Sequence, residues 1–349
     1  MSEDVWSEQD TTPDAIEAAM RAMLRTRHAE NEQLAPARVL NLVVVVDREW
    51  KGEISNRLER AGRYHGSRTI LCAVEDRRTT LDAFATVSYD NPEDRLGVMW
   101  EKIEIDMGPE HLPTLQTIID PIIISALPTV LWVPHRHDDA VHALLGLIDV
   151  MLLDSDDFPS AVDAFERVFA IRDHAYVIDL AWLRTTPWRE RLAASFDLPA
   201  RLHALGHVDG LDIRHRDGSS ASALLLAGWL SSRLGWKPVP LEVRPGDRRE
   251  GNVPNGDHEV RIVMRESDQN APGLAGVTIS APELSLSLER GLGGLDTTEQ
   301  LDDGTVKRWK ILGASRGEGG ILGDGIRQAL LREPTYWPAL NAARELASV

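Results

Sequence analysis

The feature that most restricts the fold of this chain is an almost unbroken apolar run, Arg38–Asp47 (RVLNLVVVVD). Its β-branched side chains favour an extended backbone, and they leave neither side of that backbone polar. A strand that is apolar on both sides must be covered on both sides, which is typical of a central strand in a parallel sheet with helices on each face. The run therefore predicts an α/β domain.

The residues after this run continue the same pattern. Residues 50–62 (WKGEISNRLERAG) predict a helix, and residues 67–76 (SRTILCAVED) predict a second buried strand. Strands and helices go on alternating up to about residue 197, which favours an open sheet with crossover helices. We therefore expect residues 36–198 to form a doubly wound, mostly parallel α/β domain of the Rossmann or flavodoxin-like type.

Two further regions flank this domain. Residues 1–35 predict an acidic N-terminal helical extension, in which Thr12 caps a helix over Pro13–Arg25. Residues 199–349 contain short alternating strands followed by helices, and they predict an α+β domain with a mainly antiparallel sheet. Within it, Arg248–Asp257 (RREGNVPNGD) is interpreted as a turn-rich loop.

Charge and cysteine content exclude several classes of function. The net charge of −17 argues against binding to nucleic acid or to an anionic membrane, because both need a basic surface. The one cysteine, Cys72, lies in an apolar run, so it predicts a buried, unreactive thiol and allows no intramolecular disulfide. The acidic N-terminus does not resemble a signal peptide, and no window reaches the roughly 18–20 apolar residues of a membrane span. We therefore expect a cytoplasmic protein.

Sequence motifs of common enzymes are missing. The glycine fingerprint of dinucleotide-binding domains should follow the first strand, where this chain has Asp47–Glu53 (DREWKGE) with a single glycine. The sequence also lacks a Walker loop, a G-x-S-x-G elbow, an H-E-x-x-H helix and a paired C-x-x-C. These absences remove the readily recognised enzyme classes, and we expect no cofactor.

Two histidines are candidate ligands in the first domain. His135 and His137 follow an apolar strand, at the end where α/β folds usually bind ligands. Together with nearby carboxylates they could hold a divalent metal. The favoured alternative is a polar loop in which Asp138 or Asp139 caps the next helix, so we expect no metal.

Three arginines are candidate anion ligands. Arg316 lies in a glycine-rich turn, residues 313–327 (GASRGEGGILGDGIR), whose backbone amides could cradle a phosphate at a helix start. The glycine spacing matches no phosphate loop, which favours a flexible loop. Arg214 and Arg216, in the segment RHR, could equally bind a phosphate or belong to a solvated loop.

The segment Asp179–Asp197 (DLAWLRTTPWRERLAASFD) concentrates tryptophan and arginine. Because proline lacks an N–H, the sequence predicts a helix ending near Arg184 and a second helix that begins after Thr186 as its N-cap. Tryptophan and arginine are enriched at interface hot spots, but they could equally form part of a core. The candidate partner-binding residues are Trp182, Arg184, Thr185, Thr186, Pro187, Trp188 and Arg189.

This segment resembles a pattern of the glucose-6-phosphate dehydrogenase assembly proteins, the OpcA family. Their Asp-Leu-x-Trp-x-Arg-x-x-Pro-Trp-Arg pattern is similar to residues 179–189. Supporting similarities are residues 65–76 (HGSRTILCAVED), residues 128–135 (PTVLWVPH) and residues 335–340 (TYWPAL). The chain departs from the family at Val133, where the family has a second tryptophan, and in the histidine-rich loop that follows.

The resemblance covers roughly residues 36–345 and implies a non-enzymatic helper. It implies that the chain binds glucose-6-phosphate dehydrogenase and promotes its active oligomer, as an assembly factor or allosteric activator in the oxidative pentose phosphate pathway. The alternative from the residues is a sensor or enzyme that binds a sugar phosphate or nucleotide at the strand-end loops of the first domain.

Overall fold

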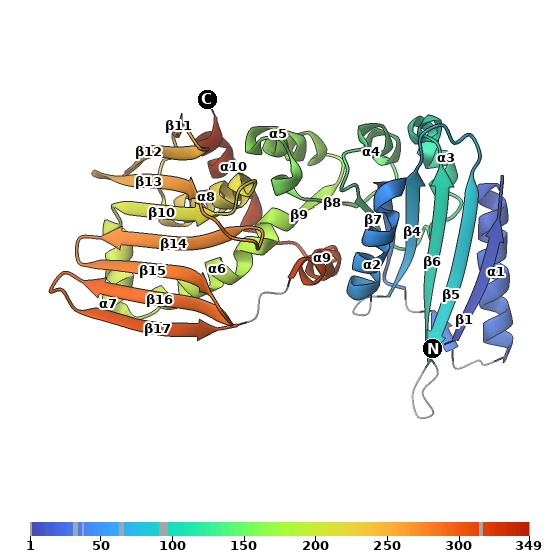
Figure 1. The fold of residues 1–349 in the computed structure, drawn as a ribbon, viewed down its shortest axis with the longest axis horizontal. Coiled ribbons are helices and arrows are strands. Elements are labelled where there is room, and N and C mark those ends of the chain that lie inside the picture. Colours follow the sequence, from blue (N-terminus) through green and yellow to red (C-terminus); the bar gives the residue numbers. More distant parts are fainter. Residues whose placement is uncertain are drawn as a thin grey trace. The chain divides into compact units, whose positions relative to one another are not determined.

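The computed structural model describes residues 2–30, 34–36, 38–62, 66–90, 97–313 and 317–348. By their internal contacts the residues form two units, each built around its own sheet (Figure 1). The first unit comprises Met1–Leu153, Ile171–Ile178 and Glu318–Leu331, and the second comprises Asp154–Ala170, Asp179–Gly317 and Arg332–Val349. Each unit is therefore assembled from separate stretches of the chain.

The first unit contains a nine-stranded sheet. Its strands are β1 (Ser2–Glu8), β2 (Leu34–Pro36), β3 (Leu40–Asp47), β4 (Ser67–Val74), β5 (Asp82–Asp90), β6 (Gly97–Met107), β7 (Thr129–Trp132), β8 (Val150–Leu153) and β9 (Tyr176–Asp179). The spatial order is β1-β5-β6-β4-β3-β7-β8-β9, with β2 beside β6. From β6 to β9 this is the order 3-2-1-4-5-6 of doubly wound dinucleotide-binding folds. Parallel pairing of β3 with β4 and β7, and of β4 with β6, confirms the predicted parallel-rich sheet.

The apolar run Arg38–Asp47 contains the central strand β3. Every residue of β3 except Asp47 is buried, as expected for a strand covered on both faces. Its one interior polar side chain, Asn41, is satisfied by the backbone: its amide donates to Ile124 O at 3.0 Å, and its carbonyl accepts from Ile124 N at 2.9 Å. The prediction of a buried central strand is confirmed.

The N-terminal extension contains a strand as well as the predicted helix. Helix α1 (Pro13–Glu30) begins where expected, and Thr12 Oγ1 accepts from Ala15 N at 3.3 Å. The strand β1, which the sequence did not predict, pairs antiparallel with β5 over its whole length at the edge of the sheet. A polar, acidic strand is compatible with an edge, where charged side chains reach water. The extension therefore completes the sheet.

Besides α1, the helices of the first unit lie between its strands in sequence, except α9, which follows all the strands of the chain. They are the α-helices α2 (Lys51–Gly62), α3 (Leu115–Ile119), α4 (Asp138–Leu144) and α9 (Gly317–Gln328), and the 3-10 helices η1 (Arg48–Trp50) and η2 (Pro109–Thr114). Much of the glycine-rich segment is helix α9, and Gly323 packs against α2, since a Cβ there would lie 3.7 Å from Ala61 Cα. Within the described residues, no helix combines the length and apolar character that crossing a bilayer requires.

The second unit contains an eight-stranded, mainly antiparallel sheet, as predicted. Its strands are β10 (Gly210–His215), β11 (Glu242–Arg244), β12 (Arg248–Asn255), β13 (His258–Glu266), β14 (Leu274–Ala281), β15 (Leu284–Gly291), β16 (Gly294–Leu301) and β17 (Val306–Leu312). The order is β11-β12-β13-β10-β14-β15-β16-β17, in which β10 and β13 are parallel. The interpretation of Arg248–Asp257 as a loop was wrong: most of it is β12, which forms a hairpin with β13 through the turn at Gly256.

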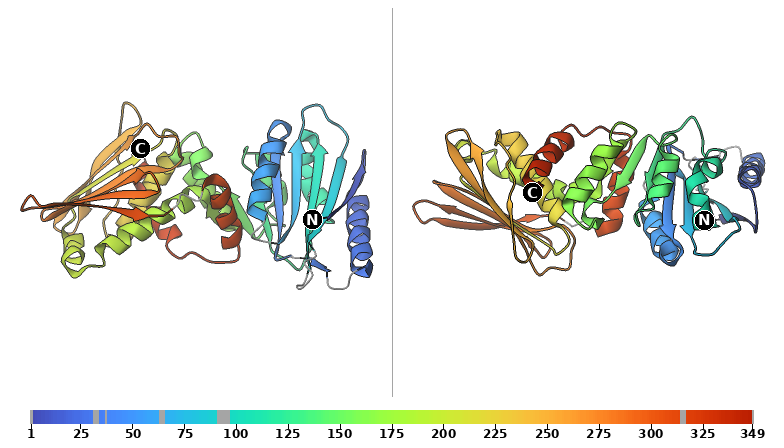
Figure 2. Two further views of the ribbon diagram at one scale, coloured as in Figure 1. Left: turned by 60° about the horizontal axis from the view of Figure 1, so that its bottom comes forward. Right: turned by 90° about the horizontal axis from the view of Figure 1, so that it is seen from above.

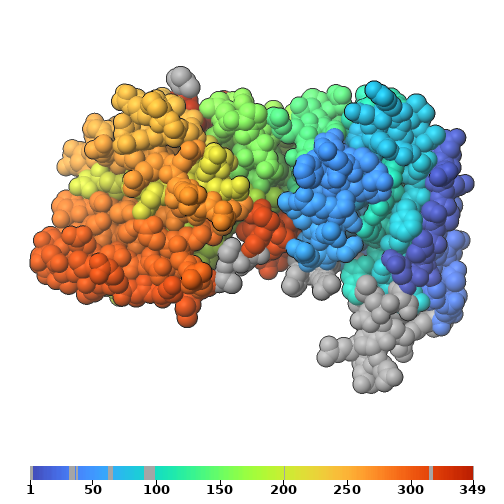
Figure 3. Space-filling view, in the orientation of Figure 1, coloured from blue at the N-terminus to red at the C-terminus, as the bar shows by residue number. Residues whose placement is uncertain are grey.

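Helices of the second unit gather on one face of its sheet (Figure 2). They are η3 (Ser155–Asp157), α5 (Ala161–Ile171), α6 (Leu180–Phe196), α7 (Pro199–Ala204), η4 (Leu205–His207), α8 (Ser220–Leu234) and α10 (Tyr336–Ala347). Helices α8 and α10 approach so closely that a Cβ at Gly228 would lie 2.2 Å from Ala339 O. The strands β14–β17 form a continuous outer surface in the space-filling view (Figure 3).

Helix α6 belongs to the second unit by its contacts, although its place in the strand–helix alternation predicts that it ends the first domain. It packs on α8, and the segment Asp154–Ala170 joins the same unit. The contact units therefore divide the chain at other points than residue 198. The boundary at residues 198 and 199, as a limit of independent folding, stays a prediction.

Candidate functional site

The tryptophan–arginine segment forms one continuous helix, α6, and the predicted break at Pro187 is wrong. A proline inside a helix costs about 3 kcal/mol, because it removes one hydrogen bond and crowds the preceding turn. Trp182 and Trp188, on either side of Pro187, are each only 2% exposed. Burying one indole removes on the order of 200 Å² from water, or up to about 5 kcal/mol. Packing of the two rings therefore outweighs the cost of the proline.

The first indole, Trp182, is held by three groups of the second unit. Its Nε1 donates to Glu333 Oε2 at 2.6 Å, and the guanidinium of Arg189 lies 3.5 Å from its ring centroid. Tyr336 packs against the ring at a centroid distance of 5.5 Å. Trp182 and Arg189 therefore lie on one face of α6.

Thr185 and Arg189 continue this arrangement along α6. Thr185, fully buried, donates from Oγ1 to Trp182 O at 2.7 Å and accepts from Arg189 Nε at 3.0 Å. Arg189 also donates to Thr186 Oγ1 at 2.9 Å. Burial lowers the pKa of Arg189 to about 10, so the guanidinium remains charged at neutral pH and attracts the Trp182 ring.

Arg184 neutralises a cluster of buried carboxylates at the start of α6. It binds Asp154 through two hydrogen bonds of 2.7 and 2.5 Å and lies 3.7 Å from Asp156. Asp156 accepts from the backbone N and hydroxyl of Ser222 in the first turn of α8, at 3.0 and 2.6 Å. Burial, together with the charge of Asp154, raises the pKa of Asp156.

Asp179 binds the first turn of α6, as Asp156 binds the first turn of α8. It caps the helix by accepting from Ala181 N at 3.0 Å, and it accepts from Ser155 N at 3.0 Å and Ser155 Oγ at 2.6 Å. The phenol of Tyr336 donates to it at 3.1 Å. Burial raises the pKa of Asp179 to about 6. The segment therefore joins η3, α6, α8 and α10 through one polar network.

This geometry answers the question of core against surface for the two tryptophans. Both rings are 2% exposed and lie in the interior of the second unit. Arg184 and Arg189 keep little accessible surface, at 8% and 12% of their side chains. Thr186 and Pro187 are half-buried, and partner contact of all seven candidate residues stays a prediction.

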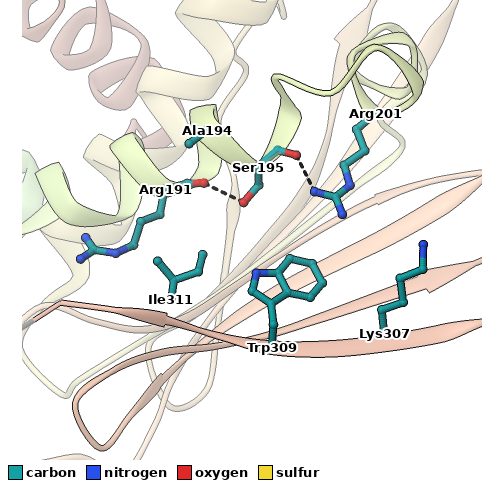
Figure 4. Close-up of a pocket in the computed structure, with 7 residues that line it drawn as sticks. All are labelled: Arg191, Ala194, Ser195, Arg201, Lys307, Trp309 and Ile311. Carbon is teal, nitrogen blue, oxygen red and sulfur yellow. Dashed lines mark hydrogen bonds between the residues drawn. The ribbon is translucent and has the colours of Figure 1, made fainter.

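Near its C-terminal end, α6 borders an open groove of about 370 Å³. We call it the α6–β17 groove; it is lined by Arg191, Ala194, Ser195, Arg201, Lys307, Trp309 and Ile311 (Figure 4). Arg201 and Lys307 extend toward one another beside the Trp309 ring, whereas the guanidinium of Arg191 points away from it. Arg201 Cζ lies 5.3 Å from the Trp309 ring centroid.

The groove is positively charged although the whole chain is strongly acidic. Buried Glu299 accepts from Arg201 Nε at 2.6 Å and lies 3.7 Å from Lys307 Nζ, so one carboxylate faces two cations. Strand β17 (VKRWKIL) carries two further cations, Arg308 and Lys310. An acidic protein therefore presents a local basic edge strand.

Exposed apolar side chains gather on the same elements. Among the described residues, twelve large hydrophobic side chains are exposed, and five of them belong to α7 and its N-terminal flank, to β17, or to the turn between β15 and β16. These five are Leu198, Leu202, Leu292, Val306 and Leu312. These five side chains lie on the elements that carry the groove or on elements next to them.

The predicted histidine ligands lie at the switch point of the first sheet, between β3 and β7. His137 Nε2 lies 3.1 Å from Asp47 Oδ1, and His135 Nδ1 accepts from Asp47 N at 3.3 Å. The ring of Trp50 packs on His135 at 5.7 Å, and burial lowers the pKa of this histidine. Ligand binding by His135 and His137 stays a prediction.

The predicted arginine ligands are dispersed. Arg214 pairs with Glu289 on the sheet of the second unit and donates to Thr278 Oγ1 at 3.2 Å. Arg216 is exposed in the turn after β10, and Arg316 lies outside the described residues. Their binding of an anion stays a prediction. Cys72 is fully buried as expected, and burial raises the pKa of its thiol to about 12.

Sequence reasoning recognised β17 as a strand but missed its role in a groove. The signal was present in the order Lys-Arg-Trp-Lys of residues 307–310, which concentrates positive charge and an aromatic ring in an acidic chain. This strand lies beside α6 and α7, which come more than 100 residues earlier in the sequence, and local patterns cannot show that these elements are neighbours.

Comparison with known families supports one assignment for both halves of the chain. Two family models, which describe the two domains of a "Glucose-6-phosphate dehydrogenase subunit", match this sequence. Residues 58–170 match the model of the N-terminal domain, and residues 175–301 match the model of the C-terminal domain. The names of both models contain OpcA, and the name of the N-terminal model also refers to assembly.

Curated relatives carry the name OxPP cycle protein OpcA. The protein of Synechococcus elongatus is 29% identical over 190 residues, which are 53% of this chain and 41% of the relative. That of Synechocystis is 25% identical over 232 residues, which are 65% of this chain and 49% of the relative. The matched part of this chain thus spans less than half the length of each.

Solved structures share the fold at low identity. An aldose-aldose oxidoreductase from Caulobacter crescentus superposes with a TM-score of 0.50 and 13% identity, over 88% of this chain and 95% of that one. An oxidoreductase from Sinorhizobium meliloti superposes with a TM-score of 0.51 and 11% identity, also over 88% of this chain and 95% of that one. These similarities concern the fold alone.

Proposed function

Since the chain belongs to the OpcA family, we propose that it is a non-enzymatic assembly factor and allosteric activator of glucose-6-phosphate dehydrogenase. The observation that carries the proposal is the match of the two dehydrogenase-related models over residues 58–170 and 175–301. We place its action in the oxidative pentose phosphate pathway and in the cytoplasm. Binding one oligomer or conformation of the enzyme more tightly by about 1–3 kcal/mol would change its activity several-fold.

Geometry at the switch point supports a role without catalysis. A dinucleotide would place its pyrophosphate at the N-terminus of α2, directly after β3. In this chain that position holds bulky Trp50 in place of glycine, and Asp47, Glu49 and Glu53 bring negative charge to it. Carboxylates repel a pyrophosphate, and this junction lacks the glycines that let the backbone approach a pyrophosphate in dinucleotide-binding folds. The same groups disfavour a sugar phosphate at these strand ends.

We propose the α6–β17 groove as the surface that meets the dehydrogenase. It offers the half-exposed Trp309, flanked by Arg201 and Lys307. Tryptophan and arginine are enriched at interface hot spots. Its edge strand β17 has backbone groups available for pairing, and its cations favour an acidic segment on the partner. The buried network around Trp182 and Arg184 then has a supporting role, because it fixes α6 and hence one wall of the groove.

The test mixes the purified chain with the dehydrogenase of the same cell. Complex mass by light scattering and enzyme activity against substrate concentration are measured on the same samples, and Kd by titration. We expect a complex with raised activity or lowered half-saturation. In Trp309→Ala we expect Kd to rise at least tenfold, which corresponds to about 1.4 kcal/mol.

The matched control is Trp50→Ala, since Trp50 is 43% exposed in the first unit and should leave Kd unchanged. Circular dichroism shows whether each variant is folded. Absence of any complex with the unmodified chain would refute the proposed function. A complex that Trp309→Ala leaves equally tight would refute only the assignment of the groove.

A further inference from the structure

Three side chains of the second unit, His203, His207 and Glu283, come together although Glu283 is far from the histidines in sequence. Each offers one ligand atom, and these atoms all lie within 4.8 Å of one another. Within the part of the chain that the structure describes, no other three His, Cys, Asp or Glu side chains meet this spacing. The group lies outside the groove and the buried network, and the proposed function does not use it.

Helical geometry places the two histidines on one side. His203 belongs to α7 and His207 ends η4, four residues later, so their side chains project from successive turns. Their ring centroids are 4.8 Å apart. A pair of histidines at this spacing on a helix is a common arrangement of metal ligands.

Glu283 is supplied by the tight turn between β14 and β15. Only Pro282 and Glu283 separate the strands, and the proline restricts the backbone just before the ligand. The carbonyl of Glu283 accepts from Asp302 N at 3.2 Å, which fixes the turn further. Its Oε1 lies 3.7 Å from His207 Nδ1.

We propose that His203, His207 and Glu283 form a binding site for a divalent transition metal of the zinc type. Imidazole nitrogen and carboxylate oxygen suit Zn²⁺, Co²⁺ and Ni²⁺, whereas Ca²⁺ and Mg²⁺ prefer oxygen ligands alone. Bonds of 2.0–2.2 Å in a tetrahedral site separate ligand atoms by about 3.4 Å. The present spacing closes to that value by rotation of side chains that are exposed or half-buried. Three protein ligands leave one position for water or for a group of another molecule.

The bound metal would join α7 and η4 to the β14–β15 turn. Arg201, which lines the α6–β17 groove, is part of the same short helix α7. Occupancy of the site would therefore restrain one wall of the groove, which gives a local ion an effect on the neighbouring surface.

Calorimetric titration of the whole, chelator-treated chain with Zn²⁺ tests this site. We expect one tight site per chain, with affinity at least tenfold weaker in His203→Ala, His207→Ala and Glu283→Gln, and lost in the double histidine variant. Bound Co²⁺ should give the visible absorption of tetrahedral coordination in the unmodified chain and not in the double variant. A His135→Ala, His137→Ala variant is the matched control, and its affinity should be unchanged.

Any of three results would overturn the proposal: no tight site in the unmodified chain, equal affinity in the double variant, or loss of binding in the control alone. Circular dichroism without metal shows that each variant is folded. The Glu283→Gln change keeps the size of the side chain, so its effect reports the loss of the carboxylate charge. The titration needs no dehydrogenase, and its outcome is independent of the proposed function.

Discussion

Replacement of Asp179 by asparagine tests how the buried network sets the stability of the second unit. Asp179 is 1% exposed and accepts four hydrogen bonds, from Ser155 N and Oγ, Ala181 N and Tyr336 Oη. Burial raises its pKa from 3.8 to about 6, and this effect exceeds the lowering by the hydrogen bonds of Ser155. Asparagine keeps nearly the same shape but cannot ionise.

The sign of the effect follows from the raised pKa. Between pH 3.8 and about 6 the folded chain holds this proton more tightly than the unfolded chain does. The resulting stabilisation is complete below about pH 4 and is lost as the pH rises through 6. One pKa unit corresponds to about 1.4 kcal/mol, so the difference amounts to about 3 kcal/mol.

Urea unfolding of both proteins at several values between pH 4 and pH 7 measures this difference. Titrations of groups that do not interact with Asp179 cancel in the comparison, because they are common to both proteins. As the pH rises across this range, we expect the free energy of unfolding of Asp179→Asn to increase by about 3 kcal/mol relative to that of the unmodified chain. A stability difference that does not change with pH would refute the assignment of a raised pKa to Asp179.

Two further predictions concern packing and helix contact. Trp188→Ala combined with Arg189→Ala should lower the stability of the second unit by about 3–5 kcal/mol, because a buried indole is removed; a folded double variant with an unchanged urea midpoint would contradict the core assignment. Gly228→Ala should lower the melting temperature by several degrees, because its Cβ would meet Ala339 O at 2.2 Å and the backbone of α10 would have to move. An equal or higher melting temperature would show that α8 and α10 separate easily.

Sequence patterns predicted those parts of the fold that depend on the residues of a single element. The apolar run of β3 required cover on both faces, and Thr12 capped α1 as its position suggested. Strands β1 and β9 were missed for different reasons. Strand β1 is polar because it lies at a sheet edge, and β9 has only four residues and continues directly into α6.

Patterns were least informative about the candidate site, because its residues come from distant parts of the chain. The proline rule predicted a break in α6, but burial of two tryptophans on either side of Pro187 outweighs it. The groove brings Trp309 of β17 to residues of α6 and α7. Local periodicity describes each of these elements by itself and cannot show that they are neighbours.

The way in which the chain alternates between the two units has a consequence for its synthesis. A growing chain emerges from the ribosome in order, yet the first unit receives α9 only from residue 317 onward, and the second unit receives α10 last. Apolar surfaces that these helices cover, through side chains such as Ile321 and Leu340, remain uncovered until translation is nearly complete. We therefore expect a protein expressed from one half of the gene to lack part of this cover and to aggregate more readily than the whole chain.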